Sequence, residues 1–427
     1  MQNKEKKKKK LSLTTLIFIA LLAGALTGVV INYLIPANYV VDDIIVQGVF
    51  YIAGQGFIRL MRMLVVPLVF CSIVCGSMAV GDTKKLGSVG VKTLIFYLCT
   101  TAIAITVALS IANIFNPGKG LDMSQIQVTS TVSETTQSMS MTETLLDIIP
   151  VNIFNSLSEG NMLQIIVFAL ILGVILANMG DRVDIVKNFF GQFNDIMMEM
   201  TMAVMKLAPI GVFCLIAKTF AEIGFEVFIP LLKYMFCVLL ALAVQCFVVY
   251  LGLLKIFSGL NPFIFIKNFF PVMAFAFSTS TSNATIPMNI DTLAEKMGVS
   301  KKISSFTIPL GATINMDGTS IMQGVAVVFT AQAFGIPLDM MDYLTVIGTA
   351  TLASIGTAGV PSVGLITLTM VFNSVGLPIE GIALIMGIDR ILDMTRTAVN
   401  ITGDAVCTTI VASWNKAVDR DVYYNRK

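Results

Sequence analysis

The stretch Gly311–Ile321, GATINMDGTSI, decides how this chain folds. It lies inside a long apolar run, yet it presents four polar residues, Thr313, Asn315, Asp317 and Thr319. A charged side chain at the centre of a membrane helix costs at least about 2.5–3.5 kcal/mol, so it should face a cavity and have a partner. The stretch therefore predicts a membrane protein that holds a polar ligand or an ion at this depth.

The composition of the whole chain is that of a polytopic membrane protein. Its 427 residues are 56% hydrophobic and only 13% charged, with a mean hydropathy of +0.85, whereas soluble domains carry about 25% charged residues. Apolar runs of about 18 residues or more recur along its length. We expect no separate soluble domain. The net charge of +2 indicates no particular partner. We expect no nucleic-acid partner.

The basic residues predict the orientation. Residues 1–10, MQNKEKKKKK, precede an apolar run that is too long for a signal-peptide core. Lys and Arg concentrate in cytoplasmic loops, so the N-terminus and the basic tail 415–427 are both predicted to be cytoplasmic. The polar, Ser/Thr-rich segment 117–145 is then an extracellular loop. We expect a multi-pass protein of the plasma membrane.

Apolar segments predict helices over about 11–35, 52–80, 89–115, 146–179, 190–222 and 226–256. The basic loops then alternate correctly only if two later segments do not cross the membrane. These segments are 262–295, broken at STSTSN, and 343–372, broken at GTAGVPSVG. Non-helical backbone at membrane depth is tolerated only against protein or a water-filled cavity. The sequence therefore predicts two re-entrant helical hairpins.

The two hairpins belong to an internal repeat. Residues 262–335 consist of a broken hairpin followed by a helix with polar residues, and residues 343–414 follow the same plan from the opposite side. Interrupted segments at corresponding positions of inverted repeats indicate a transporter whose binding site lies near the middle of the membrane.

The last helix carries a polar stripe. Spacings of 4, 3, 4 and 4 residues separate Asp389, Asp393, Arg396, Asn400 and Asp404, which places them on one helical face. An internal ion-pair network is one interpretation. Against it, the carboxylates outnumber the arginine, and a surplus of buried carboxylates requires a cation. Oxygen ligands of this kind suit alkali or alkaline-earth cations.

The same helix indicates the substrate. An arginine in a water-lined site can bind a carboxylate with two parallel hydrogen bonds, and Asp393, one turn away, would balance an ammonium group. Together they fit an acidic amino acid. The chain has no histidine, which excludes Ser-His catalysis, histidine metal sites and histidine proton relays.

At these residues the chain resembles the dicarboxylate/amino acid:cation symporters, the glutamate/aspartate transporter family. The resemblance covers nearly the whole chain and is densest from about 278 to 413, through GATINMDGT, LASIGTAGVP and ILDMTRTAVNITGD. It implies an all-α fold of eight transmembrane helices plus two re-entrant hairpins, with inverted repeats. It also implies a homotrimer in membrane lipid that works as an elevator-type transporter.

The resemblance further implies a division of the chain. A scaffold would comprise residues 11–81 and 146–224. A transport domain would comprise residues 88–116 and 225–414, with helices at about 303–335 and 378–414 beside the two hairpins.

The family pattern also assigns substrate-binding residues. Asp393 would bind the amino group and Arg396 the side-chain carboxylate. The backbone at Gly359 and Val360 would close the second hairpin as the outer gate. The remaining polar contacts would come from Thr281, Ser282, Thr319, Thr397 and Asn400.

Three sodium sites are implied in the same way. The first would use Gly311, Asn315, Asn400 and Asp404. The second would use Thr313 with Ser354, Ile355 and Thr357. The third would use Tyr97, Thr100 and Thr101 with Asn315 and Asp317. Sodium would be co-transported, and no organic cofactor is expected.

The leading hypothesis is a sodium-coupled symporter of L-aspartate or L-glutamate. Proton coupling, and another substrate such as cystine or a neutral amino acid, stay open. An intramembrane aspartyl enzyme would need a pair of catalytic aspartates in a GxGD setting, of which ITGD at 401–404 is only half. An ion channel would need polar pore-lining residues on several helices. We therefore expect a transporter and not an enzyme.

Overall fold

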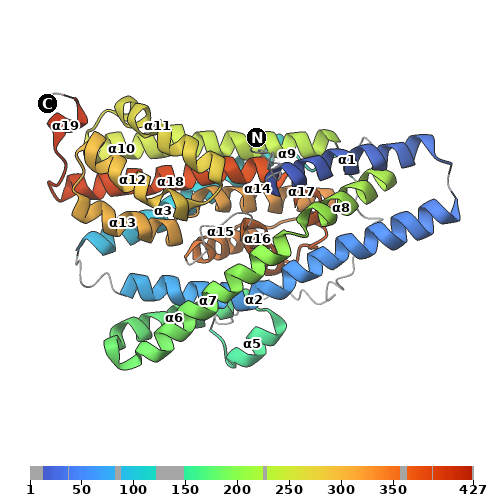
Figure 1. Cartoon of the computed structure of the whole chain (residues 1–427), viewed down its shortest axis with the longest axis horizontal. Coiled ribbons are helices and arrows are strands. Elements are labelled where there is room, and N and C mark those ends of the chain that lie inside the picture. Colours follow the sequence, from blue (N-terminus) through green and yellow to red (C-terminus); the bar gives the residue numbers. More distant parts are fainter. Residues whose placement is uncertain are drawn as a thin grey trace, which may run out of the picture.

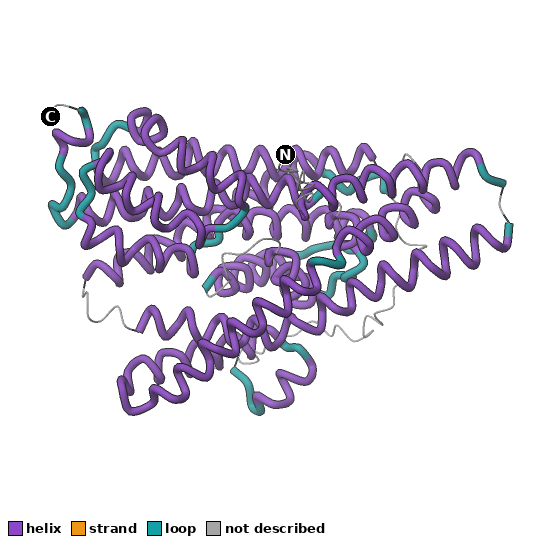
Figure 2. The backbone as a smooth tube through the Cα atoms, viewed as in Figure 1, coloured by secondary structure: helices purple, strands orange, loops and turns teal. Residues whose placement is uncertain are grey.

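The structure is a computed structural model that describes residues 13–36, 38–81, 88–121, 149–224, 228–355, 363–386 and 388–425. This part of the chain is almost entirely helical and forms no strand beyond one isolated bridge between Val299 and Val418 (Figure 1, Figure 2). The predicted all-α class is confirmed.

The first half of the chain contains mostly long apolar α-helices, together with one π-helix and one short 3₁₀-helix. They are α1 (Leu13–Leu34), the π-helix η1 (Val40–Phe50), α2 (Tyr51–Gly81), α3 (Ser88–Phe115), α5 (Ile153–Glu159), α6 (Met162–Met179), the 3₁₀-helix η3 (Gly180–Val183), α7 (Asp184–Met205) and α8 (Ala208–Ile223).

The second half contains shorter and more frequently interrupted helices. They are α9 (Phe228–Ala243), the π-helix η5 (Val244–Tyr250), α10 (Leu251–Ser258), α11 (Pro262–Thr279), α12 (Ser282–Met297), α13 (Lys301–Ile314), α14 (Asp317–Ala333), α15 (Met340–Ser354), α16 (Val363–Ser374), α17 (Gly381–Met386), α18 (Asp389–Trp414) and α19 (Arg420–Tyr423).

The helices pack in two groups. In the first, α2 lies along α6, α7 and α8, and α1 packs on α8. In the second, α18 and α14 are surrounded by α3, α9, α11, α12 and α13. Contacts of α16 with α2 and of α17 with α8 join the two groups. The polar stripe of the last helix therefore lies inside the second group.

Five helices in the described part are long and apolar enough to cross a membrane. They are Thr15–Leu34, Val89–Phe115, Gln164–Met205, Phe228–Ser258 and Pro262–Thr279. Several such helices in one chain make a multi-pass membrane protein.

The fourth and fifth predicted helices have different boundaries. The predicted separation after residue 179 is confirmed, because α6 ends at Met179 and Gly180 has a φ of +62° and a ψ of −140°. The next long helix, α7, begins earlier than expected, at Asp184, where an acidic residue is favourable in the first helical turn. A second interruption, which the sequence did not predict, lies at Lys206 and Leu207 between α7 and α8. Pro209 in the first turn of α8 explains it, because a proline has no N–H to bond the carbonyl four residues back, at Met205, and its ring clashes with that carbonyl.

The segment expected as one helix over 303–335 is two helices. α13 ends at Ile314, Asn315 has extended backbone, and α14 begins at Asp317. A break leaves the first N–H groups of the new helix without helical partners. Here the Gly318 N–H donates to Asn400 Oδ1 at 2.7 Å. The interruption is therefore stabilised by a side chain from α18. The last predicted helix, 378–414, is likewise divided into α17 and α18.

The C-terminal segment bonds to the residue before α11 and to the residue after α12. The Tyr423 hydroxyl donates to Asn261 O at 2.9 Å, just before α11. Beyond α12, the Asp419 N–H donates to Gly298 O at 2.8 Å. The tail thus ties the base of this helix pair to the end of α18.

Gly298 tests this contact. Its φ of +64° strains other residues, and a Cβ there would overlap the Asp419 carbonyl. Gly259 has a φ of +69° but open space around its Cβ position. We predict that Gly298→Ala destabilises the protein by about 1–3 kcal/mol more than Gly259→Ala, because overpacking adds to backbone strain. Thermal unfolding in detergent measures this; equal losses would contradict the contact.

Candidate functional site

The polar stripe of α18 is buried. Asp389, Arg396 and Asp404 are exposed by only 1–2%, and Asp393 and Asn400 by 7% and 4%. Charged groups at such positions need partners within the protein or a ligand. The partners therefore decide what the site can bind.

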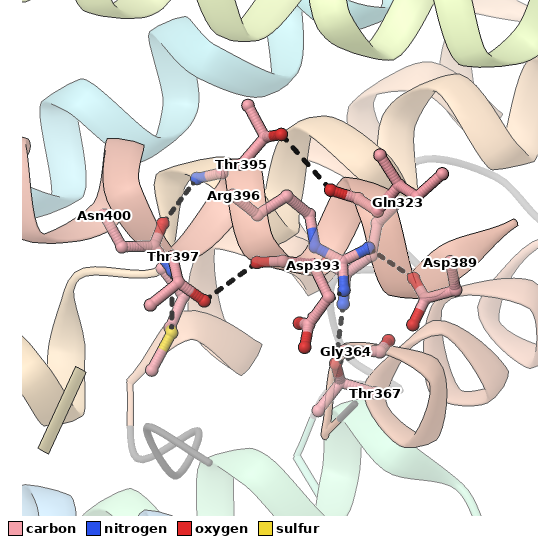
Figure 3. A network of polar contacts seen from close by, with 12 residues as sticks. Gln323, Gly364, Thr367, Asp389, Asp393, Thr395, Arg396, Thr397 and Asn400 are labelled. Atoms are coloured by element: carbon pink, nitrogen blue, oxygen red, sulfur yellow. Dashed lines mark hydrogen bonds and ion pairs between the residues drawn. The ribbon is translucent and has the colours of Figure 1, made fainter. Parts of the chain in front are cut away.

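Arg396 is held between two carboxylates (Figure 3). Its Nη1 donates to Asp389 Oδ1 at 2.6 Å, and its Nη2 donates to Asp393 Oδ1 at 2.9 Å. The sequence placed Asp389 on the same stripe but gave it no role in the site. The guanidinium is thus preorganised by one carboxylate on each side, and this cluster alone has one carboxylate in excess.

Two other helices enclose the guanidinium. A Cβ on Gly364 in α16 would lie 3.0 Å from Thr319 Cγ2 and 3.3 Å from Arg396 Nη2. Gln323 of α14 donates to Thr367 Oγ1 of α16 at 2.8 Å. Figure 3 shows Gly364 and Thr367 beside the arginine. The arm of the second predicted hairpin therefore lies directly against Arg396.

Asn400 links the stripe to the break between α13 and α14. Its Oδ1 accepts from the Gly318 N–H, and its backbone carbonyl accepts from Asn315 Nδ2 at 3.1 Å. The same Asn315 Nδ2 donates to Asp404 Oδ1 at 2.8 Å. One residue of α18 thus contacts both sides of the interruption, through its side chain and its backbone carbonyl.

The first predicted ion site is closely packed. A Cβ on Gly311 would overlap Asp404 Oδ1 and the Tyr97 hydroxyl, so only glycine fits between these oxygens. Asn315 Oδ1 is buried and has no hydrogen-bond partner in the described part of the chain. An amide oxygen in this state is available to a cation.

Asp317 lies at the start of α14 and is fully buried. Thr101 Oγ1 donates to its Oδ1 at 2.6 Å. Two residues that sequence reasoning missed, Gln245 and Tyr250, donate to its Oδ2 at 3.1 and 2.7 Å. The signal that could have found them was a glutamine inside the long apolar run between Lys233 and Lys255.

The other predicted ion ligands bond mainly within their own helices. The Tyr97 carbonyl accepts from Thr100 Oγ1 at 3.1 Å. Thr313 donates to Leu310 O at 2.9 Å and Ser354 to Thr351 O at 2.7 Å. In the described part, no hydrogen bond joins Thr313 to Ser354, or to Ile355 at the end of α15.

The remaining substrate residues fall into three groups. Thr397 and Thr319 are buried, and Thr397 Oγ1 donates to Asp393 O at 2.8 Å. Thr281 and Ser282 lie at the junction of α11 and α12. Gly359 and Val360 lie outside the described residues, as does the predicted sodium ligand Thr357.

The electrostatics of the site favour a cation. Among the side chains that the structure describes, the buried charged groups of this region are Arg396 and four aspartates, Asp317, Asp389, Asp393 and Asp404, and Glu380 before α17 is a further buried acid. The oxygens around Asp317 and Asp404 are carboxylate, amide, hydroxyl and carbonyl groups, which are ligands for hard cations. The site can therefore hold an anionic group at Arg396 and a cation at the break.

The buried pair at Arg396 yields a stability prediction. Asp389→Asn keeps the shape but removes a charge partner from a buried guanidinium, so we expect a loss of at least about 2 kcal/mol. Asp291→Asn is the control, because its pair with Lys301 is exposed and should contribute at most about 1 kcal/mol. Thermal unfolding of both variants in detergent compares them. Similar small losses of stability in both variants would mean that Asp389 contributes little to holding Arg396.

The chain is similar in sequence to proteins named as symporters. The family model described as "Sodium:dicarboxylate symporter family" matches residues 13–414. The chain is 39% identical to a "Proton/sodium-glutamate symport protein" of Bacillus caldotenax, over 95% of each chain. It is 36% identical to the "Proton/glutamate-aspartate symporter" of Escherichia coli strain K12, over 96% of this chain and 94% of the relative.

A third relative differs in its named substrate. The chain is 33% identical to "C4-dicarboxylate transport protein 1" of Ralstonia nicotianae, over 86% of each chain. All three relatives are named for transport, and the family is one of symporters rather than enzymes. The chain belongs to the sodium:dicarboxylate symporter family.

Proposed function

We propose that the protein is a secondary active transporter that carries an acidic amino acid, L-aspartate or L-glutamate, together with sodium. The observation that carries this proposal is the buried Arg396 between two carboxylates, next to a second cluster of surplus carboxylates. The names of the glutamate and glutamate-aspartate relatives support the same substrate class.

The arginine cluster is suited to exchange its partners. The side-chain carboxylate of the substrate would take a place on the Arg396 guanidinium, which binds carboxylates through two parallel hydrogen bonds. Asp393, released from Arg396, would then accept the substrate ammonium group. A plain dicarboxylate has no ammonium group and would offer Asp393 nothing in exchange for its contact with Arg396. Asp393 therefore favours an amino acid over a C4-dicarboxylate.

Sodium would bind where the oxygens of the interrupted helix meet α3 and α18. Asp404 and Asn315 serve one site, and Asp317 with the Thr101 hydroxyl serves another. Thr313 with Ser354, Ile355 and Thr357 would form a third when the second hairpin closes. Asn400 contacts the interruption and stands one turn from Arg396. Ion occupancy and substrate binding would thus be coupled through shared residues, as a symporter requires.

The proposal extends to the architecture. α11–α12 and α15–α16 would be the two re-entrant hairpins among eight transmembrane helices, with both termini in the cytoplasm. The packing of α1, α2, α6, α7 and α8 as one group supports a scaffold, and the group around α18 supports a transport domain that moves as an elevator. The scaffold would hold a homotrimer.

Purified protein in liposomes tests the transport reaction. We expect uptake of labelled L-aspartate or L-glutamate driven by an inward sodium gradient, with the preferred substrate identified by competition with a panel of amino acids and C4-dicarboxylates. A proton gradient without sodium should drive little uptake. Uptake that follows the proton gradient and ignores sodium would overturn sodium coupling, and competition by succinate alone would overturn the amino-acid assignment.

Arg396→Cys tests the role of the guanidinium. Losing its charge-assisted hydrogen bonds should weaken the binding of acidic amino acids by about 1.5–3 kcal/mol, roughly ten- to 100-fold in affinity. Neutral amino acids should then gain in relative preference. Thr395→Cys is the matched control, because Thr395 bonds only to the Ile391 carbonyl of its own helix. Undiminished uptake of acidic amino acids by Arg396→Cys would show that the carboxylate binds elsewhere.

A further inference from the structure

The helix that faces Asp317 changes its winding where it meets this residue. α9 continues into the π-helix η5 and then into α10 without a loop. Within η5, Gln245 and Tyr250 are five residues apart and both are fully buried. A π-helix closes hydrogen bonds between residues five apart, so such residues lie close to one face. In a regular α-helix they would point about 140° apart.

The π-helix therefore brings two donors to one oxygen. Gln245 Nε2 and the Tyr250 hydroxyl both donate to Asp317 Oδ2. Asp317 Oδ1 instead accepts from Thr101 Oγ1 of α3. The two carboxylate oxygens thus have different neighbours: Oδ2 accepts hydrogen bonds from η5, and Oδ1 accepts one from the Thr101 hydroxyl of α3.

The Tyr250 hydroxyl is closely packed against α18. A Cβ on Gly403 would overlap this hydroxyl and would lie 2.7 Å from Asn315 Nδ2. The glycine leaves room for Tyr250 to reach Asp317 between two helices. Tyr250 therefore contacts the interrupted helix and α18 at the same place.

We propose that Gln245 and Tyr250 are positioning residues for the co-transported cation. They hold Asp317 Oδ2 so that Oδ1 stays directed at the cation position beside Thr101, and they do not themselves bind the ion. Groups that hydrogen-bond a metal ligand commonly change metal affinity by about 10–100-fold when removed. This inference rests on the proposed sodium-coupled transport and adds the residues that set its ion affinity.

The test uses Tyr250→Phe in full-length protein in liposomes. The sodium concentration for half-maximal aspartate uptake should rise by about tenfold or more. The KM for aspartate at saturating sodium should stay within about twofold of wild type, because Arg396 and its partners are untouched. Gln245→Leu should shift the sodium dependence in the same direction.

Tyr234→Phe is the matched control. Tyr234 lies on α9, is fully buried, and its hydroxyl has no hydrogen-bond partner in the part of the chain that the structure describes. Its removal should leave the half-saturating sodium concentration unchanged. This control separates loss of a specific hydroxyl from loss of any buried phenol on this helix.

A purely structural role gives a different result. Tyr250→Phe would then lower the unfolding temperature or the amount of folded protein, while the sodium dependence of the remaining transport matched wild type. That outcome, or a rise in the aspartate KM alone, overturns the inference. Failure of the proposed function appears in wild-type protein itself, as uptake that is indifferent to sodium, and is recognised before any variant is compared.

Discussion

A buried carboxylate at a break in a helix is the constraint on which the rest of the structure depends. Asp317 begins α14 inside the protein, where an unpartnered charge would cost several kcal/mol. Three donors from α3 and η5 surround it, and Asn400 of α18 satisfies the freed N–H of Gly318. The helices that supply these groups must pack around the break. The arrangement of the second helix group follows from that requirement.

The break also explains how two binding events can share one region. A continuous helix would bond all its own backbone groups and leave none for other helices. The interrupted one presents Asn315 and Asp317 to neighbouring helices and lets Asn400 contact both sides. Arg396 lies one turn away on the same helix as Asn400. Under the proposed coupling, a change at the break would reach the arginine through α18, the helix that carries both Asn400 and Arg396.

The arginine cluster shows why charge surplus and selectivity belong together. Arg396 is neutralised twice, by Asp389 and by Asp393, so a carboxylate ligand can replace one partner without leaving the guanidinium bare. In the proposed binding step, Asp393 exchanges Arg396 for the ammonium group that an amino acid brings. The proposed selectivity thus rests on pairing rules for buried charges rather than on the shape of a pocket alone.

The sequence by itself determined the helical class, the membrane location and the buried stripe of α18, because hydropathy and the helical period are local properties of the chain. It also located the polar residues of the interruption, since polar groups in apolar runs are visible without a fold. Only the tertiary structure decided that Asp389 pairs with Arg396 and that Gln245 and Tyr250 anchor Asp317. The first depends on side-chain conformations in a crowded interior. The second depends on a local π-helical register and on contacts across more than sixty residues, which no local pattern encodes.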